Sequence, residues 1–138
     1  LELGKIRILE RHGDDVALFA CGYMLPRALE AARALATIGV MATVVEVHTL
    51  KPLDVDGIAG VLRLTNAAVS VEDHNIIGGL GSAIAEVIAE QAPARLARIG
   101  VRDVFGESGV AGPLLDKYHM GIDDIVEAAC RVVENKKR

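Results

Sequence analysis

The segment from residue 67 to residue 90 reads AAVSVEDHNIIGGLGSAIAEVIAE. Its first five residues form an apolar run that is typical of a β-strand. Glutamate, aspartate and histidine follow, and three glycines stand at positions 78, 79 and 81. From residue 80 to about residue 90, apolar residues return with helical spacing. The segment therefore predicts a strand, a tight corner and a helix, the repeating unit of an α/β protein.

The same alternation extends over the rest of the chain. Apolar runs predict strands, and helical spacing of apolar residues predicts helices. Asp54 is a candidate N-cap, and Gly39 is placed to end a helix. The predicted strands are 6–10, 16–21, 42–47, 67–71 and 95–101, and the predicted helices are 25–36, 54–63, 80–90 and one that begins near 121. Strands that alternate with helices imply a mostly parallel sheet with helices on both faces.

The composition is that of one globular domain. The chain has 138 residues, of which 51% are apolar, so we expect a single domain over residues 1–138. Two Phe, two Tyr and no Trp leave the core to Ala, Val, Ile and Leu. Such small side chains let helices lie close on a sheet.

Charge and cysteine usage exclude several classes of protein. A net charge of −4 gives no electrostatic footprint for nucleic acid, so no such partner is expected. No apolar run approaches the roughly 18 residues of a membrane span. Cys21 and Cys130 fit no metal-ligand spacing and are predicted to be reduced thiols of an intracellular, cytoplasmic protein. The basic end, residues 136–138, is expected to complement the dipole of the last helix.

The glycine cluster fits no nucleotide-binding fingerprint. Gly79 and Gly81 begin the pattern G-x-G-x-x-G, but Ile84 stands where the third glycine is required. A P-loop would need Gly-Lys followed by Ser or Thr, which is absent. Each glycine costs roughly 0.5–1 kcal/mol of backbone entropy. Two interpretations remain open, namely close packing against another backbone and anion binding at the N-terminus of the helix.

Glu72, Asp73 and His74 form the most polar strand end of the sequence. In an extended strand, Glu72 and His74 point the same way. Such a pair could perform acid/base work or supply two metal ligands. No second His or Cys pair stands at ligand spacing. A solvated strand end, a subunit or domain contact and a metal or catalytic site all remain open, and no catalytic, cofactor-binding or metal-binding residue is assigned.

Several short segments follow one another in a distinctive order, and together they resemble the C-terminal domain of transketolase over nearly the whole chain. The strongest likeness lies in Val71-Glu72-Asp73-His74 with Gly78-Gly79-Leu80-Gly81-Ser82. Similar domains occur in deoxyxylulose-phosphate synthase and in the beta subunits of 2-oxoacid dehydrogenases. Further segments of the set are Gly13-Asp14-Asp15-Val16, Ala20-Cys21-Gly22-Tyr23-Met24, Lys51-Pro52-Leu53-Asp54 and Arg102-Asp103-x-Phe105-Gly106-Glu107-Ser108-Gly109, the last most similar to transketolase in its split form.

The resemblance implies a fold and an activity. The expected fold is a three-layer α/β/α sandwich with a five-stranded, mostly parallel sheet whose first short strand is antiparallel at an edge. The expected enzyme transfers two-carbon ketol units between sugar phosphates, and it uses thiamine diphosphate and Mg²⁺.

The resemblance also implies that the catalytic machinery lies elsewhere. The family binds the diphosphate and metal with a Gly-Asp-Gly segment and a later Asn-Asn, in a separate domain. Gly13-Asp14-Asp15 lacks the second glycine, and no Asn-Asn occurs. We therefore expect a non-catalytic structural and dimerisation domain that binds no cofactor by itself. Its expected partners are the N-terminal and middle transketolase domains, or a separate N-terminal subunit, in a homodimer.

Within this picture, a domain or subunit contact near the mouth of the catalytic cleft is predicted for Glu72, His74, Gly78, Gly79 and Gly81. Two alternatives to the transketolase assignment are kept. One is the C-terminal domain of a 2-oxoacid dehydrogenase beta subunit or of deoxyxylulose-phosphate synthase. The other is a free-standing module that binds an anion at Gly22 or at the glycine cluster.

Overall fold

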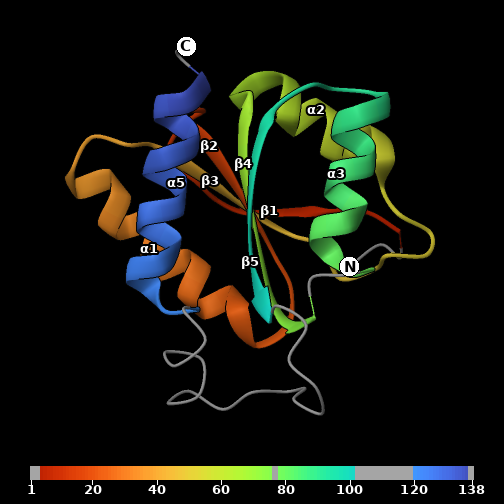
Figure 1. The fold of residues 1–138 in the computed structure, drawn as a ribbon, viewed down its shortest axis with the longest axis horizontal. Coiled ribbons are helices and arrows are strands. Elements are labelled where there is room, and N and C mark those ends of the chain that lie inside the picture. Colours follow the sequence, from red (N-terminus) through yellow and green to blue (C-terminus); the bar gives the residue numbers. More distant parts are fainter. Residues whose placement is uncertain (1–3, 76–77, 102–119, 137–138) are drawn as a thin grey trace.

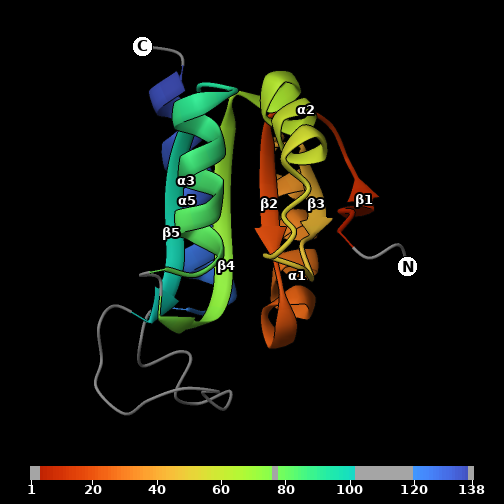
Figure 2. The ribbon, with the colours of Figure 1, turned by 90° about the vertical axis from the view of Figure 1, so that its right-hand side faces the viewer.

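The computed structural model describes residues 4–75, 78–101 and 120–136. Its five strands form one sheet in the order β1-β3-β2-β4-β5 (Figure 2). β1 pairs with β3 in antiparallel orientation, and every other pair is parallel. The predicted mostly parallel sheet with an antiparallel first strand at its edge is confirmed. The strands are β1 (Arg7–Arg11), β2 (Val16–Ala20), β3 (Ala42–Glu46), β4 (Ala67–Asn75) and β5 (Arg95–Val101).

Helices cover both faces of the sheet. α1 and α5 lie on one face, and α2 and α3 lie on the other (Figure 1). This arrangement confirms the predicted three-layer α/β/α sandwich. The helices are η1 (Gly22–Met24), α1 (Leu25–Thr37), α2 (Val55–Thr65), α3 (Leu80–Glu90) and α5 (Ile122–Lys136). The predicted motif over residues 102–109 lies outside the described residues.

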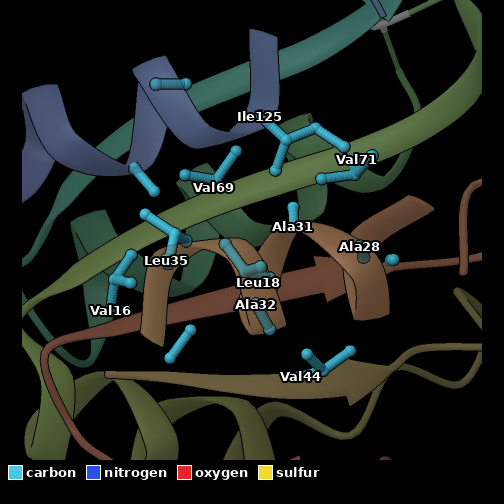
Figure 3. Close-up of a cluster of buried hydrophobic side chains, with 14 of the residues drawn as sticks. Val16, Leu18, Ala28, Ala31, Ala32, Leu35, Val44, Val69, Val71 and Ile125 are labelled. Carbon is cyan, nitrogen blue, oxygen red and sulfur yellow. The ribbon is translucent and has the colours of Figure 1, made fainter. Parts of the chain in front are cut away.

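The central strand β2 divides the core into two apolar layers. All of its residues are buried, as expected for a strand covered on both faces. Leu18 faces α1, whose small residues Ala28 and Ala32 let the helix approach closely (Figure 3). Phe19 points to the opposite face and packs among residues of α2 and α3. Successive side chains of this strand thus contribute to both apolar layers.

A local cap and two long-range hydrogen bonds stabilise the ends of α2. Asp54, predicted as its N-cap, accepts a hydrogen bond from the N–H of Gly57 at 3.0 Å, which confirms the cap. The other carboxylate oxygen of Asp54 accepts from the N–H of Ile6 at 2.9 Å. At the opposite end, Lys136 Nζ donates to the carbonyl of Thr65, the last residue of α2, at 2.7 Å. Lys136 was expected to complement its own helix, whereas here it also interacts with the C-terminus of α2.

β4 continues beyond its predicted end at residue 71 and includes the charged residues 72–74. The strand can do so because the Glu72 carboxylate is satisfied by backbone N–H groups and the Asp73 carboxylate lies beside Gly22. Charge alone therefore does not end this strand. Among the described residues, no helix is both long enough and apolar enough to cross a membrane.

Candidate functional site

The polar residues singled out from the sequence gather where β2 and β4 reach their carboxyl ends. At this edge, η1 follows β2, and the glycine corner leads from β4 into α3 (Figure 1). Ligands of α/β sheets bind in the crevice outside the carboxyl ends of the strands. We therefore regard this edge, built by residues 21–24, 72–73 and 78–82, as the candidate site.

Glu72 holds the N-terminus of α3. Its side chain is fully buried, and its two carboxylate oxygens accept hydrogen bonds from the N–H groups of Leu80, at 3.0 Å, and Gly81, at 2.7 Å. The N-cap residue Gly79 makes no such bond through a side chain. A carboxylate at this position satisfies donors that the helix cannot satisfy itself, and it complements the helix dipole. For Glu72, the interpretation as a solvated strand end is wrong.

Gly81 brings α3 close to the sheet. A Cβ atom at this position would lie 2.8 Å from the hydroxyl oxygen of Ser70 on β4 and 2.8 Å from Cδ of Arg98 on β5. α3 therefore packs closely on the sheet at this residue, but against side chains and not against another backbone as the packing interpretation expected. The N-terminus of α3 is occupied by the chain's own carboxylate, that of Glu72, which takes the N–H groups that the anion interpretation required.

Gly78 is the exposed part of the corner. Its φ of +76° lies in the left-handed region that favours glycine, and no heavy atom would meet a Cβ there within 4 Å. Its N–H donates to the hydroxyl of Ser82 at 3.0 Å. Of the predicted contact residues whose side-chain surroundings are described, Gly78 alone is exposed, while Glu72, Gly79 and Gly81 are buried.

Cys21 and Asp73 complete the inner part of the site. A Cβ at Gly22 would lie 3.4 Å from a carboxylate oxygen of Asp73, so the aspartate packs against η1. Burial, and then the charges of Glu72 and Asp73, raise the pKa of the Cys21 thiol to about 11. The thiol is therefore neutral near pH 7 and a poor nucleophile.

The histidines do not assemble around this site in the described part of the chain. His48 is exposed, and His12 lies near β1, where its Nε2 is 2.9 Å from a carboxylate oxygen of Glu10. The side chain of His74 and the whole of His119 lie outside the described residues, so the predicted pairing of Glu72 with His74 stays a prediction. Among the described residues, no three His, Cys, Asp or Glu side chains could hold a metal ion together.

A diphosphate does not fit the glycine corner. The N–H groups of Leu80 and Gly81, which would have to bind it, already donate to Glu72. The carboxylates of Glu72 and Asp73 would also repel an anion placed there. No catalytic step is therefore derived through thiamine diphosphate at these residues.

Comparison with known proteins identifies the family. The profile of the transketolase C-terminal domain matches residues 4–125. The chain belongs to the transketolase C-terminal domain family. This domain is 45% identical over 134 residues to a 6-deoxy-6-sulfo-D-fructose transketolase subunit from Clostridium sp. (strain MSTE9), covering 97% of the domain and 41% of the relative. It is 42% identical over 138 residues to a putative transketolase C-terminal section from Methanocaldococcus jannaschii, covering 99% of the domain and 42% of the relative.

Two further relatives bear on the enzyme class. A solved split-gene transketolase, described as an inactive β4 tetramer, superimposes with a TM-score of 0.88 at 42% identity and covers 97% of the domain. The domain spans 43% of that chain, so it is less than half as long as these transketolase relatives. A 1-deoxy-D-xylulose-5-phosphate synthase from Desulforudis audaxviator is 38% identical over 140 residues, which cover 100% of the domain and 21% of the synthase.

Proposed function

We propose that this domain is the C-terminal, non-catalytic part of a cytoplasmic, transketolase-type enzyme that transfers two-carbon ketol units between sugar phosphates. The match over residues 4–125, with relatives named as transketolase subunits, carries the proposal. The complete enzyme would use thiamine diphosphate and Mg²⁺ as its carbanion-stabilising cofactor. The cofactor would be bound by N-terminal and middle domains, or by a separate N-terminal subunit.

The domain would act by packing against those partners and by supporting a homodimer. The outer surface of the glycine corner is the proposed contact, and Glu72, Gly79 and Gly81 would fix its shape from inside. Glu72 joins β4 to the first turn of α3 through two hydrogen bonds, so it would position that turn relative to the strand. His74 belongs to the same proposed contact, because it follows in the same strand.

Gly78→Asn tests the contact without disturbing the domain itself. Asparagine tolerates the left-handed conformation, and the space around Gly78 is empty within the described residues. The isolated domain should therefore keep its stability, whereas association with the catalytic partner should weaken tenfold or more. Association is measured by analytical ultracentrifugation of the mixed subunits. Lys5→Asn, at an exposed position away from the corner, is the control. Unchanged association of Gly78→Asn would contradict the contact.

Calorimetric titration with thiamine diphosphate and Mg²⁺ tests the non-catalytic role. The domain alone should release no binding heat, because the N–H groups of Leu80 and Gly81 already donate to Glu72. Addition of the catalytic partner should then give one cofactor site per pair and ketol transfer from a ketose phosphate to an aldose phosphate. One-site binding by the domain alone would overturn the proposed role.

The synthase relative makes deoxyxylulose-phosphate synthase the second candidate. The assembled enzyme distinguishes the two. A synthase would consume pyruvate and glyceraldehyde 3-phosphate and release carbon dioxide, whereas a transketolase would require a ketose donor. Oxidation of a 2-oxoacid by the assembly would instead indicate a dehydrogenase beta subunit. A free-standing anion-binding module is disfavoured by the position of Glu72, and a thermal shift of the isolated domain with phosphate compounds would be needed to restore it.

A further inference from the structure

β5 is the outermost strand on one side of the sheet. Among the described strands it pairs only with β4, and Figure 2 shows it between α3 and α5 at the edge of the molecule. A surface depression of about 450 Å³ follows this edge along residues 94–98 and is bounded on its other side by Arg131, Val132 and Asn135 of α5. These eight residues are called the β5 groove below.

Backbone groups of β5 face the groove at alternate residues. The N–H of Arg95 donates to the carbonyl of Asn66 at 3.1 Å, so it points toward β4. Along a strand, the N–H and C=O groups of successive residues point to opposite sides. The groups of Leu96 and Arg98 are therefore directed away from β4. Such a row alternates donors with acceptors, which suits an extended peptide better than a simple anion.

The groove is basic in a chain whose net charge is −4. Arg95 and Arg131 both stand on the α5 side of the sheet, because Ala97, two residues after Arg95, packs in the apolar layer under α5. None of the described residues that line the groove is acidic. Arg131 lies 3.9 Å from the Glu127 carboxylate, in an exposed pair between successive turns of α5. Such surface pairs are weak, so both guanidinium groups can bind further carboxylates with charge-assisted hydrogen bonds.

We propose that the β5 groove binds an extended acidic segment of a partner protein, which adds to the sheet as a strand beside β5. Its backbone would pair with that of Leu96 and Arg98, and its carboxylates would reach Arg95 and Arg131. A second copy of this chain is a poor occupant, because it would bring its own arginines against those of the groove. Arg98 of the groove packs beside Gly81 of the glycine corner, but the proposed peptide contacts at Arg95 and Arg131 lie on the opposite, α5 side of the sheet. The test uses this chain alone, so its outcome does not depend on the proposed catalytic partner.

Titration of the ¹⁵N-labelled chain with the peptide acetyl-EVEVEV-amide tests the proposal. We expect saturable binding that shifts the amide signals of residues 95–100 and slows hydrogen exchange at Leu96. The affinity should fall as salt is added, because exposed charges are screened. The double variant Arg95→Ala/Arg131→Ala should bind at least tenfold more weakly, with unchanged urea unfolding.

Three controls separate strand addition from simple charge attraction. The variant Arg7→Ala/Arg11→Ala changes the opposite edge strand β1 by the same charge, and it should bind the peptide within about twofold of wild type. Acetyl-EPEPEP-amide has the same charge but lacks half of the N–H donors, so it should not bind. Tripolyphosphate can occupy Arg95 and Arg131 but has no backbone to pair with β5, so by itself it should not slow hydrogen exchange at Leu96.

Several results would overturn the proposal. They are no binding of acetyl-EVEVEV-amide, equal binding of the proline peptide, slowed hydrogen exchange at Leu96 with tripolyphosphate alone, or insensitivity to the Arg95 and Arg131 substitutions. Concentration-dependent pairing of β5 with β5 in the free chain, detected by sedimentation and amide protection, would assign the groove to a second copy and would also overturn it.

Discussion

Glu72 carries a carboxylate into the interior of the domain, where two backbone N–H groups of α3 donate to it. Glu72→Ala would leave both donors buried without this acceptor, so we expect a loss of about 3 kcal/mol in the free energy of unfolding. Glu72→Gln keeps one good acceptor and should lose less. Urea unfolding of the isolated chain, followed by circular dichroism, measures the change.

The control for Glu72 is Glu86→Ala, on the exposed side of α3. This substitution should change stability by no more than about 0.5 kcal/mol, as is usual at surface sites. Equal losses for the two alanine variants would show that the buried carboxylate does not stabilise the corner.

Cys21 should be slow to react in the folded chain. Its pKa is raised from 9.0 to about 11, first by burial and then by the charges of Glu72 and Asp73. Because the folded state disfavours the thiolate, the stability due to this shift is present below about pH 9 and is lost as the pH rises toward 11. Alkylation by iodoacetamide, in a Cys130→Ser background, should show a midpoint near pH 11 in the folded chain and a lower one in guanidinium.

Asp73→Asn tests whether the charge of Asp73 contributes to the raised pKa of Cys21. Removing this charge should move the alkylation midpoint of folded Cys21 downward, because one of the groups that disfavour the thiolate is gone. A folded midpoint at or below that of the unfolded chain would refute the assignment.

Among the elements, α2 and α3 both contain glycine within the helix, and Gly60 of α2 and Gly81 of α3 should respond oppositely to alanine. Gly81→Ala would place a methyl group 2.8 Å from the Ser70 hydroxyl and should cost about 1–3 kcal/mol as α3 is displaced from the sheet. Gly60→Ala meets nothing within 4 Å and should add about 0.5–1 kcal/mol, since alanine is the better helix former. Thermal unfolding of both variants measures these opposite changes in stability. A gain in stability at position 81 would contradict the close packing of α3.

The strands and helices were predictable from sequence because their signals are local. The apolar run of β2, the helical spacing in α3 and the Asp54 cap each lie within a few adjacent residues. The partner of Glu72 was not predictable, because it lies eight residues away across a corner whose geometry sets the contact. A signal was present nonetheless. The N-cap residue of α3, Gly79, has no side chain that could cap the helix, so the first N–H groups of α3 required an acceptor from elsewhere.

For the whole molecule, Lys136 ties the last helix to two distant segments. Its ammonium group donates to the carbonyl of Asp15 at 2.5 Å and to that of Thr65 at 2.7 Å. Lys136→Met keeps the aliphatic stem but removes these hydrogen bonds, so we expect a loss of about 1–3 kcal/mol. Hydrogen exchange should accelerate at the end of α5 and around Thr65 together. Lys5→Met, at an exposed lysine, should change neither. Faster hydrogen exchange in α5 alone would show that Lys136 does not stabilise the segment around Thr65.

Only the topology of the completed sheet brings these segments together. Lys136 lies 121 residues from Asp15 and 71 from Thr65. No periodicity in the sequence relates positions so far apart, and the basic composition of the C-terminus indicated only that some helix end would be complemented.

The Glu72 carboxylate can also be regarded as a tethered ligand. The chain presents it to α3 at an effective concentration of roughly millimolar or above, whatever the solution contains. Glu72→Gly would turn this permanent occupant into an exchangeable one. Formate or acetate could then enter beside Leu80 and Gly81, and stability would rise with the logarithm of its concentration once binding approached saturation. A single substitution would thus make the folding of this domain a readout of small carboxylates.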